Sequence, residues 1–205
     1  MVQTHHYWQR NYSLSCRHGK VGKTCFCTSL LNNQQLTKKE STEKVRAKKK
    51  EESKEQEEEY FPTVGLSVEE GSINSRIRVK LYDMGGEESY RESWEKFCRV
   101  SDAILFVVDS TDLANIHQAK DLLFELTGWP SLEGVPICII GSKSDKEGCF
   151  SDEELIVQME LVSICDREIA CFTTNFNQNH EFVKKWICDL KKRKISEEYQ
   201  GFVDV

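Results

Sequence analysis

Short apolar runs alternate with longer segments of helical periodicity along most of this 205-residue chain. The strand-like runs are residues 12–16, 77–82, 103–109, 135–141 and 169–174, and the helix-like segments include 25–31, 89–98, 113–126 and 182–190. Runs such as 103–109 are almost continuously apolar, as is typical of strands buried on both faces. Because parallel strands need long crossover connections, usually helices, the pattern predicts an α/β fold.

One pair of strands departs from this pattern. Residues 64–70 and 76–83 both look like strands, and only residues 71–75 separate them. A connection this short joins antiparallel neighbours. We therefore expect one antiparallel hairpin inside an otherwise parallel sheet.

A highly charged segment, residues 37–59, interrupts the alternation. It holds eight Lys or Arg and eight Glu, with Val45 and Ala47 as its only hydrophobic side chains, so it cannot pack into a core. Two interpretations stay open, a solvated loop or frayed helix and an arm that docks a partner. We expect one domain over residues 13–195 that carries this insert, with an N-terminal segment 1–12 and a C-terminal tail 196–205.

Composition excludes several classes of protein. The net charge of −6 gives no general attraction to nucleic acid. The nine cysteines include no Cys-x-x-Cys pair and lie mostly in apolar segments, which predicts reduced thiols rather than a disulfide framework or a zinc cluster. No apolar run approaches the ~20 residues that span a bilayer, and residues 1–10 lack the apolar stretch of a signal peptide. We therefore expect a cytosolic protein.

The segment from Arg17 to Thr24 reads RHGKVGKT and lies between a predicted strand and a predicted helix. It nearly matches the phosphate-loop pattern GxxxxGK[ST], with Arg17 where the first glycine is expected. In such a loop backbone N–H groups cradle phosphates, a lysine neutralises the β and γ oxygens, and a hydroxyl binds Mg²⁺. Lys23 and Thr24 are the candidates for those last two roles. The alternative is an ordinary strand, turn and helix with a surface lysine.

Two further motifs follow predicted strands. Asp83 begins the sequence DMGG, where a carboxylate can reach Mg²⁺ through water and Gly86 can offer its N–H to a terminal phosphate. Ser142 begins SKSD, close to the pattern [NT]KxD. The Asp145 carboxylate can accept hydrogen bonds from N1 and N2 of guanine, a donor pair that adenine lacks. Parallel strands bring their carboxyl ends to one edge, so the three motifs are expected to meet there.

Taken together with the sequence PTVG that ends at Gly65, these motifs resemble the small GTPases, specifically the Arf-like group. The sequences SWEKFCR, from Ser93, and DREI, from Asp166, are similar to the branch that positions lysosomes by recruiting kinesin adaptors. The resemblance implies a P-loop small GTPase fold, with a six-stranded, mostly parallel sheet that has one antiparallel strand and helices on both faces. It also implies a GTP/GDP switch in vesicle or lysosome-related trafficking, with Mg²⁺ as cofactor.

The resemblance further implies a set of ligand residues. Those expected at the nucleotide are Gly19, Lys20, Val21, Gly22, Lys23, Thr24, Cys25, Thr63, Gly86, Ser142, Lys143, Asp145 and Phe176, and those expected at the metal are Thr24, Thr63 and Asp83. Residues 60–65 become switch I and residues 83–92 switch II. The catalytic position, which orients the attacking water, falls on Glu87.

Three residues depart from the family pattern. Glu87 replaces glutamine, and an ionised carboxylate only accepts hydrogen bonds and adds negative charge beside the γ-phosphate, so we expect slow hydrolysis. Ser142 replaces the asparagine that ties the base-reading loop to the phosphate loop, and serine is too short to do so. Arg17 replaces the leading glycine. A scaffold of the same fold with weak or no nucleotide binding is therefore the alternative function, and a different P-loop enzyme is a third.

By the same resemblance, Leu66, Tyr82 and Phe97 would meet effectors, although each can equally be a half-buried packing residue. The sequence does not identify the exchange factor or the activating protein. Residue 2 is valine and the final four residues lack cysteine, so we expect neither N-myristoylation nor prenylation. Peripheral contact with endolysosomal membranes would depend on an N-terminal helix carrying Tyr7, Trp8 and Tyr12, whose apolar face is thin.

Overall fold

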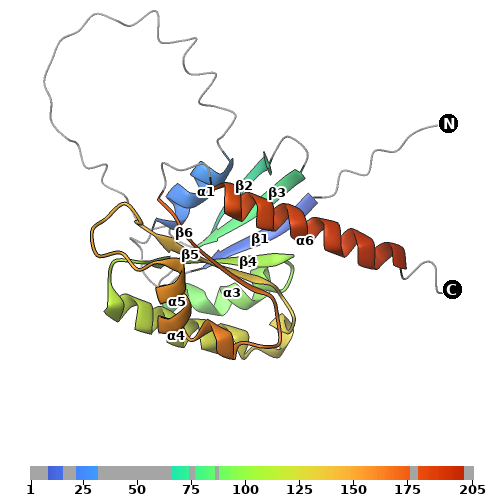
Figure 1. Ribbon diagram of the computed structural model, residues 1–205. Helices are drawn as coiled ribbons and strands as arrows, with labels where there is room; N and C mark the ends of the chain where they lie inside the picture. The colour runs from blue at the N-terminus through green and yellow to red at the C-terminus, as the bar shows by residue number, and fades with distance from the viewer. Residues whose placement is uncertain are drawn as a thin grey trace, which may run out of the picture.

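The computed structural model describes residues 9–15, 22–31, 66–73, 77–85, 88–175 and 180–200. Six strands form one sheet in the order β2-β3-β1-β4-β5-β6 (Figure 1). They are β1 (Gln9–Ser15), β2 (Leu66–Ile73), β3 (Ile77–Met84), β4 (Ala103–Asp109), β5 (Ile137–Ser142) and β6 (Ile169–Thr173). Only β2 runs antiparallel, paired with β3, and the remaining pairs are parallel.

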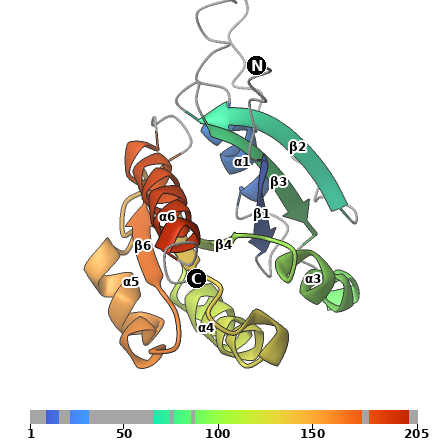
Figure 2. The ribbon, with the colours of Figure 1, turned by 90° about the vertical axis from the view of Figure 1, so that its right-hand side faces the viewer.

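Helices cover both faces of this sheet, as Figures 1 and 2 show. On one face lie α1 (Lys23–Leu31) and α6 (Glu181–Gln200), and on the other lie α3 (Arg91–Cys98), α4 (Leu113–Thr127) and α5 (Asp152–Gln158). Three short 3-10 helices complete the described elements: η2 (Glu88–Tyr90), η3 (Pro130–Leu132) and η4 (Leu161–Ser163). The predicted fold class is confirmed.

The core lies along the two central strands. Every residue of β4 and β5 is buried, because helices cover both sides of them. Phe106 on β4 and Trp94 on α3 are among the largest fully buried side chains. The apolar runs that dominated the sequence are therefore the strands that hold the sheet together.

The connection within the antiparallel hairpin is shorter than the sequence indicated. We expected the connection to begin at Gly71, but β2 continues through Ile73, where Ile73 pairs with Ile77. Gly71 has a different reason to be glycine, since a Cβ there would lie 2.8 Å from Cδ2 of Leu31. The missing side chain lets α1 pack closely on β2.

Three other boundaries differ from expectation. The first strand begins at Gln9, so Tyr12 pairs within the sheet with Leu81 and Ala103 and cannot belong to an N-terminal membrane helix. Helix α6 runs on to Gln200. The sequence analysis missed α5, although Ser151 and Glu154 form the capping box that begins it.

The described residues contain no helix long and apolar enough to cross a membrane. Eight cysteines lie in the described part of the chain, and all of them are free thiols, as predicted.

Candidate functional site

The carboxyl ends of the five mutually parallel strands meet at one edge of the sheet. Leu14 near the end of β1 pairs with Asp83 on β3, and Asp109 at the end of β4 pairs with Ser142 on β5. Helix α1 also begins at this edge, because its first turn contacts Asp83. The topology therefore gathers the three sequence motifs, as predicted for parallel strands.

The first turn of α1 is joined to the end of β3 by a hydrogen bond. The Thr24 hydroxyl donates to Oδ2 of Asp83, whose side chain is completely buried. Lys23, the residue before Thr24, is 6% exposed, so it is buried at the start of α1. Gly22 has a φ of +86°, a backbone conformation that glycine adopts without strain, immediately before the helix. These contacts are those expected where a phosphate loop leads into a helix.

Two more side chains lie in the electrostatic field of this cluster. Burial raises the pKa of Cys27 well above its ordinary value, and Asp83 and Glu69 reinforce the shift. Burial also raises the pKa of Glu69 on β2, with a further contribution from Asp83. Glu69, Asp83 and Lys23 thus all lie within electrostatic reach of the Cys27 thiol. Sequence reasoning missed Glu69, because a glutamate in an exposed edge strand looks like a solvated residue.

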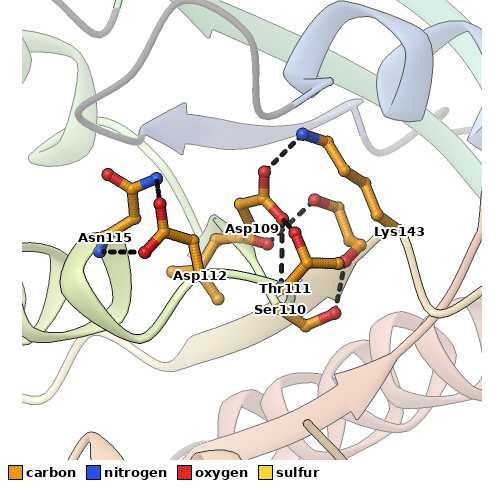
Figure 3. Close-up of polar contacts among 8 residues, drawn as sticks. Asp109, Ser110, Thr111, Asp112, Asn115 and Lys143 are labelled. Atoms are coloured by element: carbon orange, nitrogen blue, oxygen red, sulfur yellow. Dashed lines mark hydrogen bonds and ion pairs between the residues drawn. The ribbon is translucent and has the colours of Figure 1, made fainter. Parts of the chain in front are cut away.

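A second polar cluster lies at the ends of β4 and β5 (Figure 3). Lys143 forms an ion pair with Oδ2 of Asp109, and Oδ1 of Asp109 accepts from the Thr111 amide at 3.1 Å and hydroxyl at 2.7 Å. Burial alone would raise the pKa of Asp109, but the hydrogen bonds from Lys143 and Thr111 outweigh it and hold that pKa below its ordinary value. Lys143 has a φ of +64°, so the ion pair holds a backbone conformation that is rare for lysine. Asp109 is thus an ionised anchor for the SKSD segment.

The loop that follows Asp109 at the end of β4 continues directly into α4. Asp112 caps that helix, since Oδ1 accepts from the Ala114 amide at 2.9 Å and Oδ2 accepts from Nδ2 of Asn115 at 2.8 Å (Figure 3). The cap fixes the chain just after Thr111. The loop between β4 and α4 is therefore held at one end by the contacts of Asp109 and at the other by the Asp112 cap.

Ser142 uses its hydroxyl inside the sheet. Its Oγ donates to the Val108 carbonyl at 2.9 Å, and its own carbonyl accepts from the hydroxyl of Ser110. All three residues are buried. Ser142 therefore ties β5 to β4.

The remainder of the SKSD segment contacts the residue that follows β6. The Ser144 amide donates to the Thr174 carbonyl at 3.4 Å, and the Thr174 amide donates to the Gly141 carbonyl at 2.8 Å. Asp145 is exposed, beside this connection, where a ligand can reach its carboxylate. The segment is thus supported by β4 through Lys143 and by the end of β6 through Ser144.

Several predicted site residues lie outside the described part of the chain. They are Gly19, Lys20, Val21, Thr63, Gly86, Glu87 and Phe176, together with Arg17. The described ones are Gly22, Lys23, Thr24, Cys25, Asp83, Ser142, Lys143 and Asp145. Of these, the structure joins Thr24 to Asp83 and places Lys23 beside them, and it builds the SKSD segment on the neighbouring strand ends.

The donor set at Thr24 and Asp83 suits a magnesium ion. Mg²⁺ prefers oxygen ligands, and this pair offers a hydroxyl and a carboxylate that already lie in hydrogen-bond contact. Among the described residues, no three His, Cys, Asp or Glu side chains group as the ligands of a larger metal centre would. The two side chains fit an ion that a phosphate helps to bind.

The predicted effector residues lie on the β2–β3 hairpin and on the neighbouring helix α3, which carries Phe97. Leu66 is 38% exposed and Val68, opposite Tyr82 on the neighbouring strand, is 46% exposed. The Tyr82 ring lies 5.4 Å from the Phe97 ring, and both side chains are half-buried. These four residues, Leu66, Val68, Tyr82 and Phe97, form an apolar face that we call the hairpin face. Sequence reasoning had not included Val68.

The two branch motifs have structural roles in this chain. Nε1 of Trp94, in SWEKFCR, donates to the Gly85 carbonyl at 3.0 Å, which holds the DMGG segment at its first glycine. The Arg167 guanidinium, in DREI, is buried and donates to the carbonyls of Leu132 and Thr127 at 2.8 and 3.0 Å. Glu168 accepts from Nε1 of Trp186 on α6 at 2.7 Å. The motifs therefore join elements on both faces of the sheet.

Comparison with known proteins agrees with this geometry. The sequence model of the ADP-ribosylation factor family matches residues 46–189. ADP-ribosylation factor-like protein 8b of Arabidopsis thaliana is 37% identical over 133 residues, which cover 62% of this chain and 72% of that protein. ADP-ribosylation factor-like protein 8c of the same plant is 35% identical over 114 residues, which cover 56% of this chain and 61% of that protein.

The fold is also similar to a solved structure, that of the Arl6 BBS3 small GTPase from Trypanosoma brucei with the bound nucleotide analogue GppNp. The TM-score is 0.66 at 21% sequence identity, over 91% of this chain and 97% of that one. At this identity the likeness concerns the fold. The sequence resemblance to the Arf-like group is confirmed by the family match, which spans most of the chain, and by the two relatives. This chain belongs to the ADP-ribosylation factor family.

Proposed function

We propose that this protein is a Mg²⁺-dependent GTP/GDP switch of the Arf-like type. The observation that carries the proposal is the hydrogen bond from the Thr24 hydroxyl to the buried Asp83 carboxylate at the start of α1, with Lys23 beside it. A hydroxyl, a carboxylate and a lysine at a helix N-terminus are the groups that bind a polyphosphate and its metal in this class of protein.

Each residue at the phosphate end has a defined role in the proposal. Lys23 neutralises the β and γ oxygens, and the α1 N-terminus, which carries no acidic residue in its first turn, favours an anion. Thr24 and Asp83, with Thr63, hold Mg²⁺, which when bound neutralises charge between the β and γ phosphates. Glu87 takes the place that orients the attacking water, so hydrolysis is slow.

At the base end, Asp145 accepts hydrogen bonds from N1–H and the N2 amino group of guanine. Asp145 is held by the SKSD segment, in which Lys143 pairs with Asp109 and Ser144 contacts Thr174. Because an exposed carboxylate on a rigid loop can select the base without rearranging, we expect guanine to be preferred over adenine.

The proposed switch acts through the hairpin face. Leu66, Val68, Tyr82 and Phe97 present an exposed apolar surface beside switch II, where a change in nucleotide can alter what effectors bind. From the sequence resemblance we further propose a role in lysosome-related trafficking, with peripheral association at endolysosomal membranes. An exchange factor and an activating protein would set the nucleotide state.

Two observations favour a second candidate, a scaffold of the same fold that binds nucleotide weakly. The Ser142 hydroxyl is bonded to Val108 within the sheet. The family match also begins at residue 46, after Arg17 and the rest of the phosphate-loop sequence. The second candidate therefore predicts an intact effector surface with little affinity for GDP.

Titration with a fluorescent guanine nucleotide separates the two candidates. Under the switch proposal the full chain binds GDP and GTP, binding weakens when Mg²⁺ is removed, and excess ATP does not compete. Lys23→Ala removes a phosphate contact and should reduce affinity by at least about tenfold, a loss of roughly 1.4 kcal/mol. Failure of the full chain to bind GDP at millimolar concentration would favour the scaffold.

A matched substitution tests the base end. Asp145→Asn exchanges a carboxylate, which accepts from guanine, for an amide that suits the carbonyl at C2 of xanthine. We expect the variant to lose affinity for GDP and to gain affinity for xanthosine diphosphate. Equal loss for both nucleotides would count against Asp145 as the base-reading residue.

A further inference from the structure

A buried histidine links the two ends of the candidate site. His180 lies immediately before α6 and is 5% exposed. Its Nε2 is hydrogen-bonded to the Ser29 hydroxyl of α1 at 2.8 Å, and its Nδ1 to the Thr174 hydroxyl at 3.0 Å. Its ring also packs edge-on against Phe26, with centroids 4.8 Å apart. One side chain thus contacts α1, α6 and the residue that follows β6.

The hydrogen bonds of this link run in one direction. The Thr174 hydroxyl donates its single proton to the Asn175 carbonyl at 3.1 Å, so toward His180 it must accept. Nδ1 of His180 is then the protonated nitrogen, and Nε2 accepts from the Ser29 hydroxyl. The chain Ser29–His180–Thr174–Asn175 therefore pairs each of these donors with an acceptor.

The ring remains neutral under ordinary conditions. Burial lowers the pKa of His180 to about 4, and the nearby Lys184 adds to this shift. A neutral imidazole offers one donor and one acceptor, which is what the two hydroxyls require. A fully satisfied buried polar network fixes one arrangement of the elements that it joins, because any other arrangement leaves a polar group without its hydrogen bond.

The elements that the network joins are the two ends of the site. Ser29 lies on the helix that begins with Lys23 and Thr24. Thr174 accepts from the Ser144 amide and donates to the Gly141 carbonyl, so it supports the SKSD segment. The Ser142 hydroxyl is bonded to Val108 on β4. His180 thus connects α1 with the residue that supports the base-reading segment.

We propose that His180 is a positioning residue that couples the phosphate-binding helix to the base-reading segment, so that one guanine nucleotide is held at both ends. This inference rests on the proposed function. Helix α1 and the start of α6 lie on the same face of the sheet in both views, which is the arrangement the link requires (Figures 1 and 2). Losing the link leaves each half of the site intact but frees one to shift relative to the other, and nucleotide release becomes faster.

The test compares GDP release in four full-length variants with that of the unmodified chain. His180→Leu fills the space but removes both hydrogen bonds. The triple variant Ser29→Ala, Thr174→Val and His180→Leu also removes both hydroxyls, so that the carbonyl of half-buried Asn175 is the one polar group of the link that loses this donor. His180→Gln retains one donor and one acceptor. His117→Leu replaces an exposed histidine on α4 and is the matched control.

We expect GDP release to be about tenfold faster in His180→Leu and in the triple variant, and within about threefold of the unmodified chain in His180→Gln. The triple variant should keep a melting temperature close to that of the unmodified chain, since its cluster is wholly apolar. His117→Leu should release GDP at the unmodified rate. If His180→Leu fails to fold, the triple variant and His180→Gln still carry the comparison.

Two results would overturn the inference. The first is a GDP release rate in the triple variant equal to that of the unmodified chain. The second is a release rate that rises across all variants only in proportion to the fall in melting temperature. The second result would mean that His180 contributes to stability alone. Failure of the unmodified chain to bind GDP is a different result, because it overturns the proposed function on which the inference rests.

Discussion

Glu87 stands at the position where the resemblance to the Arf-like group places a glutamine. A glutamine amide can both accept from the attacking water and donate toward the transferring phosphoryl group, whereas an ionised carboxylate only accepts. We predict that Glu87→Gln raises the single-turnover rate of GTP hydrolysis by at least about tenfold, equivalent to about 1.4 kcal/mol of transition-state stabilisation. The measurement is phosphate release from preloaded GTP.

Binding has to be separated from chemistry in that experiment. Glu87→Ala serves as the control, because it removes the negative charge without supplying a donor. GTP affinity should be similar in both variants. An unchanged hydrolysis rate in Glu87→Gln, with binding intact, would show that residue 87 does not orient the water.

The ion pair between Asp109 and Lys143 makes stability depend on pH. Burial would raise the pKa of Asp109, but hydrogen bonds from Lys143 and Thr111 lower it below the ordinary value of the unfolded chain. Because the folded pKa is depressed, the stabilisation is complete above about pH 4, the ordinary Asp value, and is lost as the pH falls through the folded pKa. We predict that Asp109→Asn costs about 1–2 kcal/mol at pH 7 and progressively less below pH 4.

Urea unfolding of both proteins across this pH range measures the difference. Asp121→Asn, at an exposed position on α4, is the matched control and should show a small difference that does not follow the same curve. A difference for Asp109→Asn that grows as the pH falls would contradict the assignment of Asp109 as an ionised anchor.

At the scale of elements, Gly141 decides how closely α5 and β6 approach β5. A Cβ at this position would lie 2.5 Å from Cδ1 of Leu155 and 2.8 Å from Cγ2 of Thr173. Neither atom can move far in a packed core, so we predict that Gly141→Ala costs about 1–3 kcal/mol of stability. Thermal denaturation measures the loss. Because Gly141 directly precedes Ser142, the anchored SKSD segment should be disturbed as well.

Gly128→Ala provides the comparison for that substitution. Gly128 follows α4 with a φ of −75°, and the nearest atoms to an added Cβ lie 3.4 Å away. Alanine fits there, so the melting temperature should change little. Equal destabilisation by both substitutions would mean that close packing at Gly141 is not the cause.

The elements that the sequence predicted best are those whose burial is complete. The strand β4 has the bounds expected from its apolar run, because only a strand covered on both faces tolerates such a run. The sequence predicted an end of β2 that is too early, because a glycine that forms a turn cannot be distinguished in sequence from one that lets a helix pack closely, as Gly71 does. Helix α5 was missed because it is only seven residues long, too short for a clear period.

The residues of the candidate site also fall into two groups, those that the sequence predicts and those that it does not. Lys23, Thr24 and Asp83 were predicted, because short motifs at strand ends describe their chemistry. Asp109 and His180 were not, since their roles depend on partners far along the chain, Lys143 for Asp109 and Ser29 for His180. A single aspartate or histidine carries no spacing signal, and only the packing of the strands and helices reveals its partners.

At the scale of the whole molecule, the site is made by strands and helices that are distant in sequence. The Thr24–Asp83 contact joins α1 to β3, the Asp109–Lys143 pair joins the end of β4 to the loop after β5, and His180 joins α1 to the start of α6. The sheet order sets these neighbours, since β1 lies between β3 and β4. Nucleotide binding should therefore stabilise the whole domain rather than one lobe.

Deleting the charged segment 37–59 tests whether the fold requires it. With Val45 and Ala47 as its only hydrophobic side chains, it offers almost nothing to bury. Between the end of α1 at Leu31 and the start of β2 at Leu66, its removal leaves eleven residues, which can extend over about 35 Å. That reach is ample, because Leu31 packs beside Gly71, and the five residue steps from Gly71 back to Leu66 cover about 17 Å of strand.

We therefore predict that deleting residues 37–59 changes the melting temperature by less than about 4 °C, equivalent to about 1 kcal/mol for a chain of this size. GDP affinity should also be retained, because Lys23, Thr24, Asp83 and Asp145 lie outside the segment. A version in which the Glu and Lys residues of the segment are replaced by Ser and Gly, at full length, separates the effect of charge from that of loop length. A fall of more than about 8 °C on deletion, with no fall in the Ser/Gly version, would show that the segment is needed as a spacer. A fall of that size in both would show that its charged side chains pack against the domain.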